Sequence, residues 1–408
     1  MAPRRIIAGL DIGTTKVSCA VGESLQDGGI RLLGQGECPC EGIERGSLVN
    51  LEATVDSIDA AVEAASKMAD LSIRGAWIGI SGEHVKSVNS RGVIGISRRE
   101  KEVIPEDLDR VLEAARAVKI PADRELLHVI PRGFTVDDQP GIRDPVGMSG
   151  VRLEAEVHIV TVASTPMRNL ARAVSRAGLG VESFVLSPLA ASLAILEDDE
   201  RGLGVALVDI GGGTTDIAIF QDGVVRHTAV LGLGGKHLTQ DVAIGLRTPA
   251  ERAEELKVQH GCALSSQVSP DEVVEVPGVG GRSPRVISRQ VLAAIIEPRA
   301  EEILTMVGHE LERCGVTDLL AAGVVLTGGS ALLPGFVELA ERVLGVPARI
   351  GMPRGIEGLP GGEGRPQDAA ALGLWMYGTE LDRTRCGGSR GILKFLRRPI
   401  REWVRDYL

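Results

Sequence analysis

The stretch VDIGGGTTDI (208–217) lies between two apolar runs, VALV (205–208) at its start and IAIF (217–220) at its end. Short apolar runs bounded by glycine are typical of buried strands. The glycine- and threonine-rich centre between them is typical of a tight turn. The stretch therefore predicts a β-hairpin, and not a strand that leads into a helix.

A shorter copy of this motif, LDIGTTK (10–16), lies about half the chain earlier. The apolar run RIIAGL (5–10) leads into it, and VSCAV (17–21) follows it. Two copies of one hairpin, one in each half of the chain, predict two similar lobes that face each other across a cleft.

Further apolar runs bounded by glycine predict more buried strands, and helical patterns lie between them. The runs are GAWIGISG (75–82), AEVHIVTVAS (155–164) and AGVVLTGGS (322–330), and the helical patterns cover 51–69, 105–118, 165–178 and 288–314. This alternation predicts an α/β fold. At 408 residues the chain should form at least two domains. Aromatic residues make up 2%, so Val, Ile, Leu and Ala must build the core, which suits parallel strands covered by helices.

Charge and hydropathy exclude several classes of protein. The formal net charge of −10 argues against a nucleic-acid binder, which would present a broad basic surface. No apolar run approaches the ~20 residues of a transmembrane helix. Asp11 interrupts the first apolar run before it reaches the length of a signal peptide. We therefore expect a cytosolic body.

The cysteines and histidines show no metal-binding spacing. Of the six cysteines only Cys38 and Cys40 are close, and no second Cys or His pair lies at zinc-ribbon spacing from them. Free thiols in a reducing cytoplasm are the better interpretation. His128 and His158 lie in alternating strand patterns and are expected to be structural.

The duplicated hairpins offer a way to hold phosphate. Neither GxxxxGK[ST] nor GxGxxG occurs in the chain, so the P-loop and dinucleotide signatures are absent. Glycines let backbone N–H groups approach an anion closely, and Thr hydroxyls add donors. The expected donors are Gly13, Thr14, Thr15, Gly211, Gly212, Gly213, Thr214 and Thr215. Two such turns from opposite lobes would hold the β- and γ-phosphates of one nucleotide from both sides.

Charged residues next to the turns fit this interpretation. Asp11 and Asp209 would flank the phosphates, where carboxylates hold Mg²⁺, typically through its waters. Lys16, just past the first turn, would be a charge partner for the phosphates. The alternative is a pair of ordinary glycine-rich turns, which a single copy would favour. The duplication favours a nucleotide site.

The chain finishes in the apolar and basic segment GILKFLRRPIREWVRDYL (391–408). Its apolar residues share one helical face, and its basic residues take the remainder. The apolar set is Ile392, Leu393, Phe395, Leu396, Ile400, Trp403, Val404 and Tyr407, and the basic set is Lys394, Arg397, Arg398, Arg401 and Arg405. A basic amphipathic helix with Trp and Tyr near its boundary is typical of an interfacial membrane anchor. Pro399 would start this helix or kink it.

The alternative for 391–408 is a helix docked on the protein's own core. The polar, glycine-containing stretch at 378–390 argues against docking, because it predicts a flexible linker before the tail. One tail is a weak, reversible anchor, since each basic side chain gains only about 1 kcal/mol near an anionic surface. Many tails in one row would multiply the attachment by avidity.

Five segments together resemble the motifs of the actin/Hsp70/sugar-kinase superfamily, in that family's order. LDIGTTK (10–16) and VDIGGGTTDI (208–217) resemble its two phosphate motifs, and VVLTGGSALLPG (324–335) resembles its adenosine motif. SPLAASLAIL (187–196) and DAAALGL (368–374) resemble its two connecting helices. The set covers the chain from its start to about residue 375 and is specific, although each motif alone is weak.

Within this superfamily the chain resembles the FtsA family of bacterial cell-division proteins. The similarity lies in 232–261, 277–285 and 296–304, in the segment 86–163 and in the amphipathic tail. The resemblance implies an actin-like two-lobed ATPase fold with an FtsA-type inserted subdomain and a C-terminal amphipathic helix. The implied domains are 1–85 with 164–200 and 368–377 as the first lobe core, 86–163 as the insert, 201–244 with 306–367 as the second lobe core, 245–305 as a smaller subdomain, 378–390 as the linker and 391–408 as the membrane-targeting helix.

The resemblance also implies further nucleotide contacts. The base and ribose would lie near Gly328, Gly329 and Ser330 of the adenosine motif and near Glu254 and Lys257. Gly234, Gly235 and Lys236 would line the same cleft. Without the resemblance, Glu254 and Lys257 would be interpreted as a solvated pair on one helix.

Ser187 departs from the superfamily pattern. Superfamily hydrolases place Glu or Gln at the matching position to orient the attacking water, and Ser is too short for that role. We therefore expect ATP and Mg²⁺ binding with slow hydrolysis at most. A small-molecule kinase is the first alternative; it would need a catalytic base in the cleft and gives the tail no role. A chaperone ATPase is the second, and it would need a peptide-binding domain after residue 378.

The partners implied are further copies of the chain in an actin-like filament, an anionic membrane surface on the cytoplasmic side of the bacterial cell membrane at midcell, the C-terminal peptide of FtsZ, and later division proteins. The smaller subdomain at 245–305 is the candidate site for FtsZ. No nucleic acid is expected.

Overall fold

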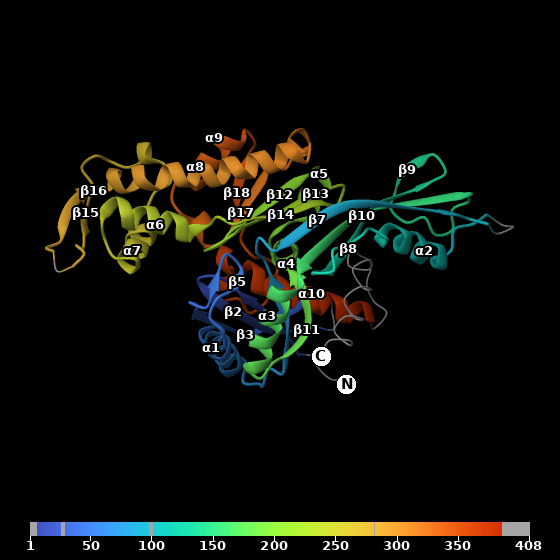
Figure 1. The fold of residues 1–408 in the computed structure, drawn as a ribbon, viewed down its shortest axis with the longest axis horizontal. Coiled ribbons are helices and arrows are strands. Elements are labelled where there is room, and N and C mark those ends of the chain that lie inside the picture. The colour runs from blue at the N-terminus through green and yellow to red at the C-terminus, as the bar shows by residue number, and fades with distance from the viewer. Residues whose placement is uncertain (1–5, 26–28, 98–100, 281, 386–408) are drawn as a thin grey trace.

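The computed structural model describes residues 6–25, 29–97, 101–280 and 282–385. Figure 1 shows the first lobe below and the second lobe above it, with one small subdomain at each end of the second lobe. No helix within these ranges is long and apolar enough to cross a membrane. The membrane helix predicted at 391–408 lies outside the described residues.

The first lobe is a five-stranded sheet in the order β11-β6-β1-β2-β3. β1 and β2 form an antiparallel hairpin, while β6 and β11 run parallel to β1. The strands are β1 (Ile6–Ile12), β2 (Lys16–Ser24), β3 (Ile30–Pro39), β6 (Gly75–Ile80) and β11 (Gly180–Leu186); the helices are α1 (Leu51–Ala69), α3 (Ser164–Arg176), α4 (Ser187–Ile195) and α10 (Ala369–Arg385), and β4 (Ile43–Glu44) pairs with β5 (Ser47–Leu48). α1 covers β2 and β3, and α10 packs on β1, β2 and β6. The sheet is therefore buried under helices, as its apolar strands require.

The second lobe repeats this architecture. Its sheet has the order β14-β13-β12-β17-β18, with β12 and β13 as an antiparallel hairpin and β17 and β18 parallel to β12. The elements are α5 (Asp198–Leu203), β12 (Val205–Ile210), β13 (Thr215–Gln221), β14 (Val224–Leu231), α6 (Gly235–Leu246), α8 (Arg289–Arg313), η2 (Thr317–Leu319), β17 (Val324–Thr327), η3 (Gly329–Leu332), α9 (Phe336–Leu344), β18 (Ala348–Ile350), η4 (Pro360–Gly362) and η5 (Pro366–Asp368). The same strand order in both lobes confirms the internal repeat and the α/β fold that the sequence predicts.

The insert forms a subdomain of its own. Its sheet has the order β7-β10-β8-β9, and α2 packs on β7 and β10. The elements are β7 (Val85–Gly95), α2 (Pro105–Arg116), β8 (Arg124–Val136), β9 (Gln139–Ile142) and β10 (Arg152–Ala163). Its apolar core is separate and small, with Val111, Phe134 and Leu153 among the buried members. The insert also contacts β14 through β7, β8 and β10, so it packs against the edge strand of the second lobe.

A smaller subdomain extends from the other end of the second lobe. It contains α7 (Ala250–His260), η1 (Ser265–Gln267) and the hairpin of β15 (Val273–Val276) and β16 (Arg285–Ser288), and α8 runs from it back into the lobe. Ser288 caps the start of α8 by accepting a hydrogen bond from the backbone N–H of Gln290. Residues of this subdomain share one apolar core with the second lobe.

The prediction of a flexible linker at 378–390 is wrong for its first part. α10 continues to Arg385, beyond the expected end of the connecting helix at residue 377. Thr379 and Leu381 are buried, and the Thr379 hydroxyl donates to the Trp375 carbonyl one turn earlier. The polar composition of this stretch is thus compatible with a helix, because its few apolar side chains fall on the face that packs inward.

Candidate functional site

The two predicted hairpins close with the same backbone geometry. The Gly13 N–H donates to the Lys16 carbonyl at 2.9 Å, and the Gly211 N–H donates to the Thr214 carbonyl at 2.9 Å. In the first hairpin Ile12 pairs with Val17, and in the second Ile210 pairs with Thr215. Each turn therefore has four residues, and the two loops are structurally equivalent.

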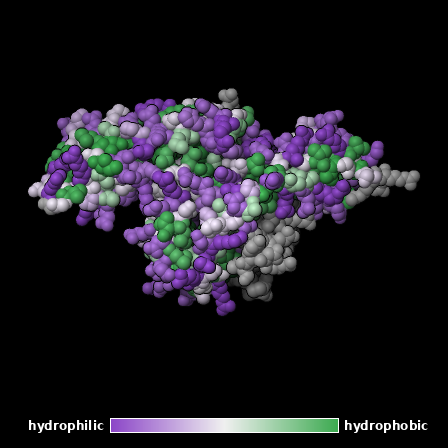
Figure 2. Space-filling model, in the orientation of Figure 1, coloured by the Kyte–Doolittle hydropathy of each residue, from purple (hydrophilic) through white to green (hydrophobic). Residues whose placement is uncertain are grey.

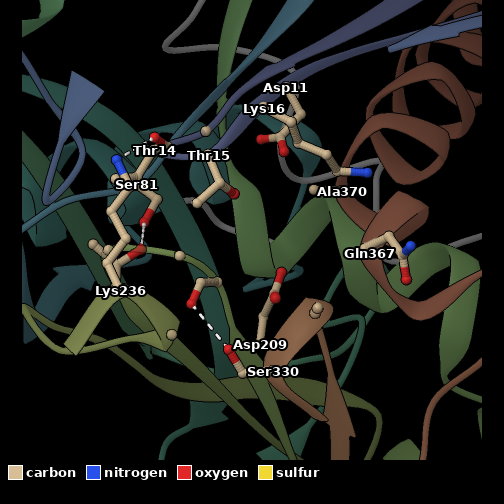
Figure 3. A pocket seen from close by; sticks show the side chains of 18 of the residues that line it. Asp11, Thr14, Thr15, Lys16, Ser81, Asp209, Lys236, Ser330, Gln367 and Ala370 are labelled. Carbon is tan, nitrogen blue, oxygen red and sulfur yellow. Dashed lines mark hydrogen bonds between the residues drawn. The ribbon is translucent and has the colours of Figure 1, made fainter. Parts of the chain in front are cut away.

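Both turns open into one cavity between the lobes, with a volume of about 520 Å³ (Figure 3). Predicted residues that line it are Asp11, Gly13, Thr14, Thr15, Lys16, Asp209, Gly211, Gly212, Gly213, Thr214, Gly235, Lys236, Glu254, Lys257, Gly328, Gly329 and Ser330. Residues from β1 to η3, more than three hundred positions apart, thus meet at one site. The cleft expected from the repeat is present.

The tips of the two turns touch each other, which explains part of their glycine content. A Cβ atom on Gly213 would lie 2.5 Å from the Thr14 hydroxyl oxygen, and one on Gly212 would lie 2.3 Å from the Thr15 methyl carbon. Neither position has room for a side chain. The hairpins can approach to this distance only because the second turn consists of glycine at its tip.

Three aspartates line the cleft. Asp11 and Asp209 come from the ends of equivalent strands, and Asp216 pairs with Asp209 across the β12–β13 ladder. Desolvation raises the pKa of Asp11 to about 6, against the lowering effects of Lys16 and of a Ser187 hydrogen bond. Desolvation also raises the pKa of Asp209 well above its usual value, and the charges of Asp216 and Asp11 raise it further. The site concentrates more negative charge than its own cations neutralise.

Asp216 and Ser81 join the lobes and were not predicted from the sequence. The Ser81 hydroxyl, at the end of β6 in the first lobe, lies 2.6 and 2.7 Å from the two carboxylate oxygens of Asp216 in the second. Thr214 donates to the same carboxylate at 3.1 Å. Burial raises the pKa of Asp216 to about 7, although both hydroxyl groups lower it. The alternation of side chains along β13 was the signal that could have found Asp216, two residues after Thr214.

Lys16 in the first turn and Lys236 at the start of α6 have different environments. Lys16 donates to Glu37 at 2.8 Å and to Asp368 at 3.2 Å, and Arg365 bonds both of these carboxylates. Lys236, at the start of α6, donates to the Thr14 carbonyl at 3.0 Å and so bridges the lobes. Lys16 thus belongs to a charge network at the cavity wall, and Lys236 links the tip of one turn to the helix that follows the other.

The opposite end of the cavity is formed by α7 and the η3 region. Lys257 is buried and donates to Glu254 at 2.7 Å, to the Thr239 hydroxyl at 3.0 Å and to the Gly235 carbonyl at 3.2 Å. Thr239 in turn donates to Glu254. The interpretation as a solvated pair is therefore wrong for Lys257, whereas the Glu254 side chain is 45% exposed. Gly328 has φ +84°, and a Cβ there would lie 2.4 Å from an Asp209 carboxylate oxygen.

Two predicted residues lie outside the cavity wall. Thr215 is fully buried, and its hydroxyl donates to the Leu233 carbonyl at 2.8 Å. It pairs with Ile210 and shares that residue's core-facing side of the sheet, because side chains alternate along a strand. Gly234 lies behind the second turn, where a Cβ would meet the Gly211 carbonyl oxygen at 2.6 Å.

Ser187 lies at the start of α4 and lines the cavity beside Asp11. A Cβ on Gly79 would be 2.9 Å from both the Asp11 carboxylate and the Ser187 hydroxyl, which shows how close the three residues lie. Gly79, Ser81, Glu37, Gln367 and Ala370 also line the cavity and were not predicted from the sequence.

The donor set fits a phosphate chain with a divalent cation. The second turn presents the backbone N–H groups of Gly212 and Gly213, which have no side chain of their own to obstruct an anion. Asp11, Asp209 and Asp216 supply the hard carboxylate oxygens that Mg²⁺ prefers. A cation would also offset the burial of these charges, which raises the pKa of all three carboxyl groups, and the repulsion that adds to it at Asp209 and Asp216.

Comparison with protein families gives two matches. The model described as "Cell division protein FtsA" matches residues 206–373, and the model described as "SHS2 domain inserted in FTSA" matches residues 82–161. The second range lies over the insert expected at 86–163.

Curated relatives match most of the chain. The cell division protein FtsA of Pseudomonas aeruginosa is 47% identical, over 92% of this chain and 90% of that protein. Those of Escherichia coli K12 and Bacillus subtilis are each 42% identical, over 98% and 92% of this chain and 96% and 84% of those proteins respectively.

Solved structures share the fold at low sequence identity. A PilM–PilN type IV pilus biogenesis complex aligns with a TM-score of 0.66 at 19% identity, over 93% of this chain and 100% of that chain. MreB5 of Spiroplasma citri bound to ADP aligns with a TM-score of 0.56 at 14% identity, over 94% of this chain and 99% of that chain. The fold is therefore actin-like.

Proposed function

The chain belongs to the FtsA family of cell division proteins, and we propose that it is the ATP-binding, membrane-tethered, actin-like component of the division ring. The observation that carries this proposal is the pair of equivalent turns, one from each lobe, that line a single cavity of about 520 Å³. One nucleotide held by both turns would join the lobes, so its binding would affect the arrangement of the whole molecule.

ATP would lie with its terminal phosphates between the two turns and its adenosine toward α7 and η3. Gly211, Gly212 and Gly213 would cradle the phosphates from one side, and Gly13 and Thr14 from the other. Lys257 and Glu254, fixed by their own hydrogen bonds, would border the ribose and base. The same fold holds ADP in MreB5 of Spiroplasma citri, which supports a nucleotide as the ligand.

Mg²⁺ would be held near Asp11 and Asp209, through its waters, and would supply charge neutralisation for the phosphates. The carboxylates would orient the ion, and the Ser81–Asp216 hydrogen bonds join the two lobes beside these carboxylates. No carboxylate or amide stands at Ser187 to orient an attacking water, so hydrolysis is slow. Phosphate release at several turnovers per second from the purified protein would contradict this.

The test of nucleotide binding is a direct titration. Asp209→Asn should weaken binding of ATP with Mg²⁺ at least about tenfold, because a charge that holds the ion is lost. Asp222→Asn is the matched control, since Asp222 lies in the exposed turn between β13 and β14 and pairs with Arg226. Equal affinity of the two variants would overturn the proposed site.

Membrane attachment would come from the amphipathic segment 391–408. One such tail binds weakly, so nucleotide-dependent polymerisation that aligns many tails would control attachment by avidity. The chain truncated after residue 390 should bind ATP normally and fail to co-sediment with anionic liposomes. Undiminished co-sedimentation of the truncated chain would refute the anchor without affecting the nucleotide site.

The C-terminal peptide of the FtsZ ring polymer would bind the smaller subdomain at 245–305, as the family resemblance implies. Supporting this, Val273 and Val286 of that subdomain are both more than half exposed. Figure 2 shows hydrophobic side chains gathered at that end of the molecule. Val286→Glu should reduce binding of an FtsZ tail peptide, and Val93→Glu, on the exposed surface of the insert, is the matched control. Equal peptide binding by the two variants would exclude Val286 from the contact.

A further inference from the structure

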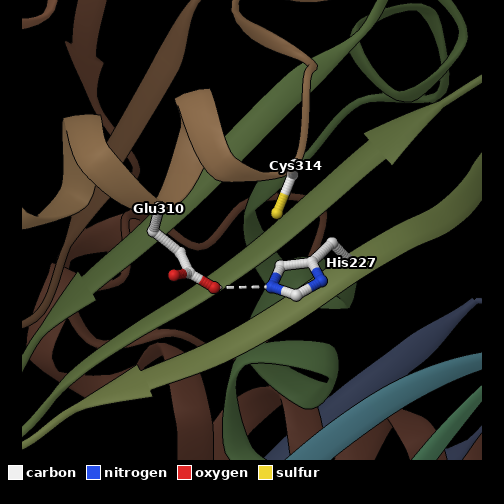
Figure 4. A group of neighbouring side chains, drawn as sticks. All are labelled: His227, Glu310 and Cys314. Carbon is white, nitrogen blue, oxygen red and sulfur yellow. Dashed lines mark hydrogen bonds and ion pairs between the residues drawn. The ribbon is translucent and has the colours of Figure 1, made fainter.

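Three side chains that offer different metal-binding atoms meet at the edge of the second lobe, away from the cleft (Figure 4). They are His227 on β14, Glu310 on the last turn of α8 and Cys314 just after that helix. One ligand atom from each lies within 4.8 Å of the other two. No local sequence pattern indicates this group, because 83 residues separate His227 from Glu310.

Two local features bring these side chains together. Glu310 and Cys314 are four residues apart on the end of α8, so they lie on the same face of the helix. His227 lies beside a register shift between β13 and β14 at Ile219 and Phe220, and irregularities of this kind re-aim side chains along a strand. The imidazole therefore points across to the helix end.

The group is accessible and partly pre-organised. The side chains of His227 and Glu310 are 14% and 12% exposed, and Cys314 is a half-buried free thiol. His227 Nε2 lies 2.7 Å from a Glu310 carboxylate oxygen. The ring of His158 packs edge-on against the His227 ring at 5.8 Å and limits its rotation. Arg313 bonds both oxygens of Glu310 from the solvent side.

The simpler interpretation is that His227, Glu310 and Arg313 form a hydrogen-bonded group and that the Cys314 thiol has no role in it. Against it, imidazole, thiolate and carboxylate are the three donor types of zinc sites, and sites with three protein ligands keep a fourth position for water. In such sites a hydrogen-bonded outer partner typically orients a ligand, and Arg313 takes that place for Glu310.

We propose that His227, Glu310 and Cys314 bind one borderline transition-metal ion of the Zn²⁺ class, with water as the fourth ligand. Metal–ligand bonds of about 2.0–2.3 Å put the donor atoms of a tetrahedral site about 3.3–3.8 Å apart. The present separations, from 2.7 Å for His227 and Glu310 to no more than 4.8 Å, bracket this spacing. Mg²⁺ is a poor candidate, since it prefers oxygen ligands alone.

The bound ion would tie β14 to the end of α8. β14 is the edge strand on which the insert packs, through β7, β8 and β10, and α8 runs from the smaller subdomain through the core of the second lobe. The ion would therefore hold against α8 the edge strand on which the insert packs. This site is independent of the nucleotide cleft and of the function proposed for it.

Cobalt(II) substitution tests the site, because a thiolate ligand gives Co²⁺ an intense charge-transfer absorption that carboxylate ligands do not. The full-length chain carrying Cys386→Ser, kept reduced with a non-chelating phosphine and in excess Mg²⁺, is titrated with Co²⁺ and then with Zn²⁺. We expect one Co²⁺ per chain with this absorption and its displacement by Zn²⁺. Cys314→Ser should abolish the absorption, and Cys38→Ser, which alters another half-buried thiol, should retain it.

His227→Gln and Glu310→Gln should each weaken Zn²⁺ binding at least about tenfold, measured by competition with a chromophoric chelator. His227→Gln keeps a polar side chain at the position and serves as the second test if Cys314→Ser fails to fold. Zn²⁺ should also raise the unfolding temperature of the parent chain and leave that of His227→Gln unchanged. Absence of the thiolate absorption, its persistence in Cys314→Ser, or equal Zn²⁺ affinity of parent and His227→Gln would overturn the proposal.

Discussion

Asp209 and Asp216 face each other across one hydrogen-bonded ladder, and Asp11 approaches them from the opposite lobe. At the scale of single residues the cleft is thus governed by the desolvation of three neighbouring carboxylates, and mutual repulsion adds to it at Asp209 and Asp216. Desolvation is the largest cause of the raised pKa values at all three positions. Either a bound cation or a proton must neutralise this negative charge. Which of the two does so depends on the pH and on the Mg²⁺ concentration.

Asp216→Asn should change how stability depends on pH. The pKa of Asp216 is raised from 3.8 to about 7 in the folded chain. Between these values the folded state holds a proton that the unfolded state has lost, so this group's contribution to stability falls as pH rises from about 4 to about 7. In the absence of Mg²⁺ and nucleotide, the variant should be more stable than the parent above about pH 7, by at most a few kcal/mol.

Chemical denaturation at about pH 5 and about pH 8 measures this difference. The variant should lose less stability than the parent between the two values. Asp222→Asn, in an exposed turn, is the control that should follow the parent. A stability difference between Asp216→Asn and the parent that does not vary with pH would contradict the assignment.

Gly328→Ala should destabilise the fold by about 1–3 kcal/mol, because the residue has φ +84° and its Cβ would contact an Asp209 oxygen at 2.4 Å and the Ile210 carbonyl at 2.5 Å. Gly329→Ala is a matched control one residue away, with no heavy atom within 4 Å of its added Cβ. The free energy of unfolding of both variants distinguishes them. Equal destabilisation would mean that the backbone at Gly328 relaxes freely.

At the scale of elements, α7 carries two ion pairs that have the same sequence spacing but differ in solvent exposure. Lys257–Glu254 and Arg252–Glu255 are both three residues apart. The first points into the cavity and Lys257 is buried, while the second is exposed on both sides. One face of the helix therefore serves the site, and the other is an ordinary solvated surface.

Lys257→Met should lower nucleotide affinity by about tenfold or more, since hydrogen bonds to a charged group in a desolvated site are worth about 1.5–3 kcal/mol. It should also leave Glu254 with one partner fewer. Arg252→Met should leave affinity unchanged. Titration calorimetry measures the nucleotide affinity of both variants. Equal affinities would show that Lys257 of α7 does not contribute to nucleotide binding.

At the scale of the whole molecule, a few hydrogen bonds near the turn tips couple the lobes. Ser81 to Asp216 and Lys236 to the Thr14 carbonyl cross the cleft. Beyond these, α10 packs on the first lobe while η5, which leads into it, bonds the second lobe through the Pro366 carbonyl and Thr327. A ligand between the turns would add to this set and so favour the closed arrangement.

Ser81→Ala should therefore weaken ATP-dependent assembly on lipid monolayers, because it leaves Asp216 without its partner from the other lobe. Ser90→Ala is the control, as it removes a comparable bond to the Ala115 carbonyl inside the insert. Electron microscopy with and without ATP measures filament formation. Assembly of Ser81→Ala indistinguishable from that of Ser90→Ala would show that this bond does not couple the lobes.

Much of the fold was predictable because its signals are local. The run VDIGGGTTDI and its copy LDIGTTK contain both the apolar strands and the glycines of each turn within a few residues. Pattern and turn chemistry therefore specified two equivalent hairpins, and the duplication specified two lobes. The cavity residues that belong to these turns, such as Gly13 and Gly212, followed directly.

The sequence by itself determined the hairpins, the repeated α/β lobes and the chemistry of the turns, because each depends on neighbours along the chain. Alternation along β13 puts Asp216 and Thr215 on opposite sides of the sheet, and the tertiary structure decided which side lines the cleft. It also decided that Ser81 reaches Asp216 and that His227 meets Glu310 and Cys314. These contacts join distant segments, and their geometry is set by how whole sheets and helices pack.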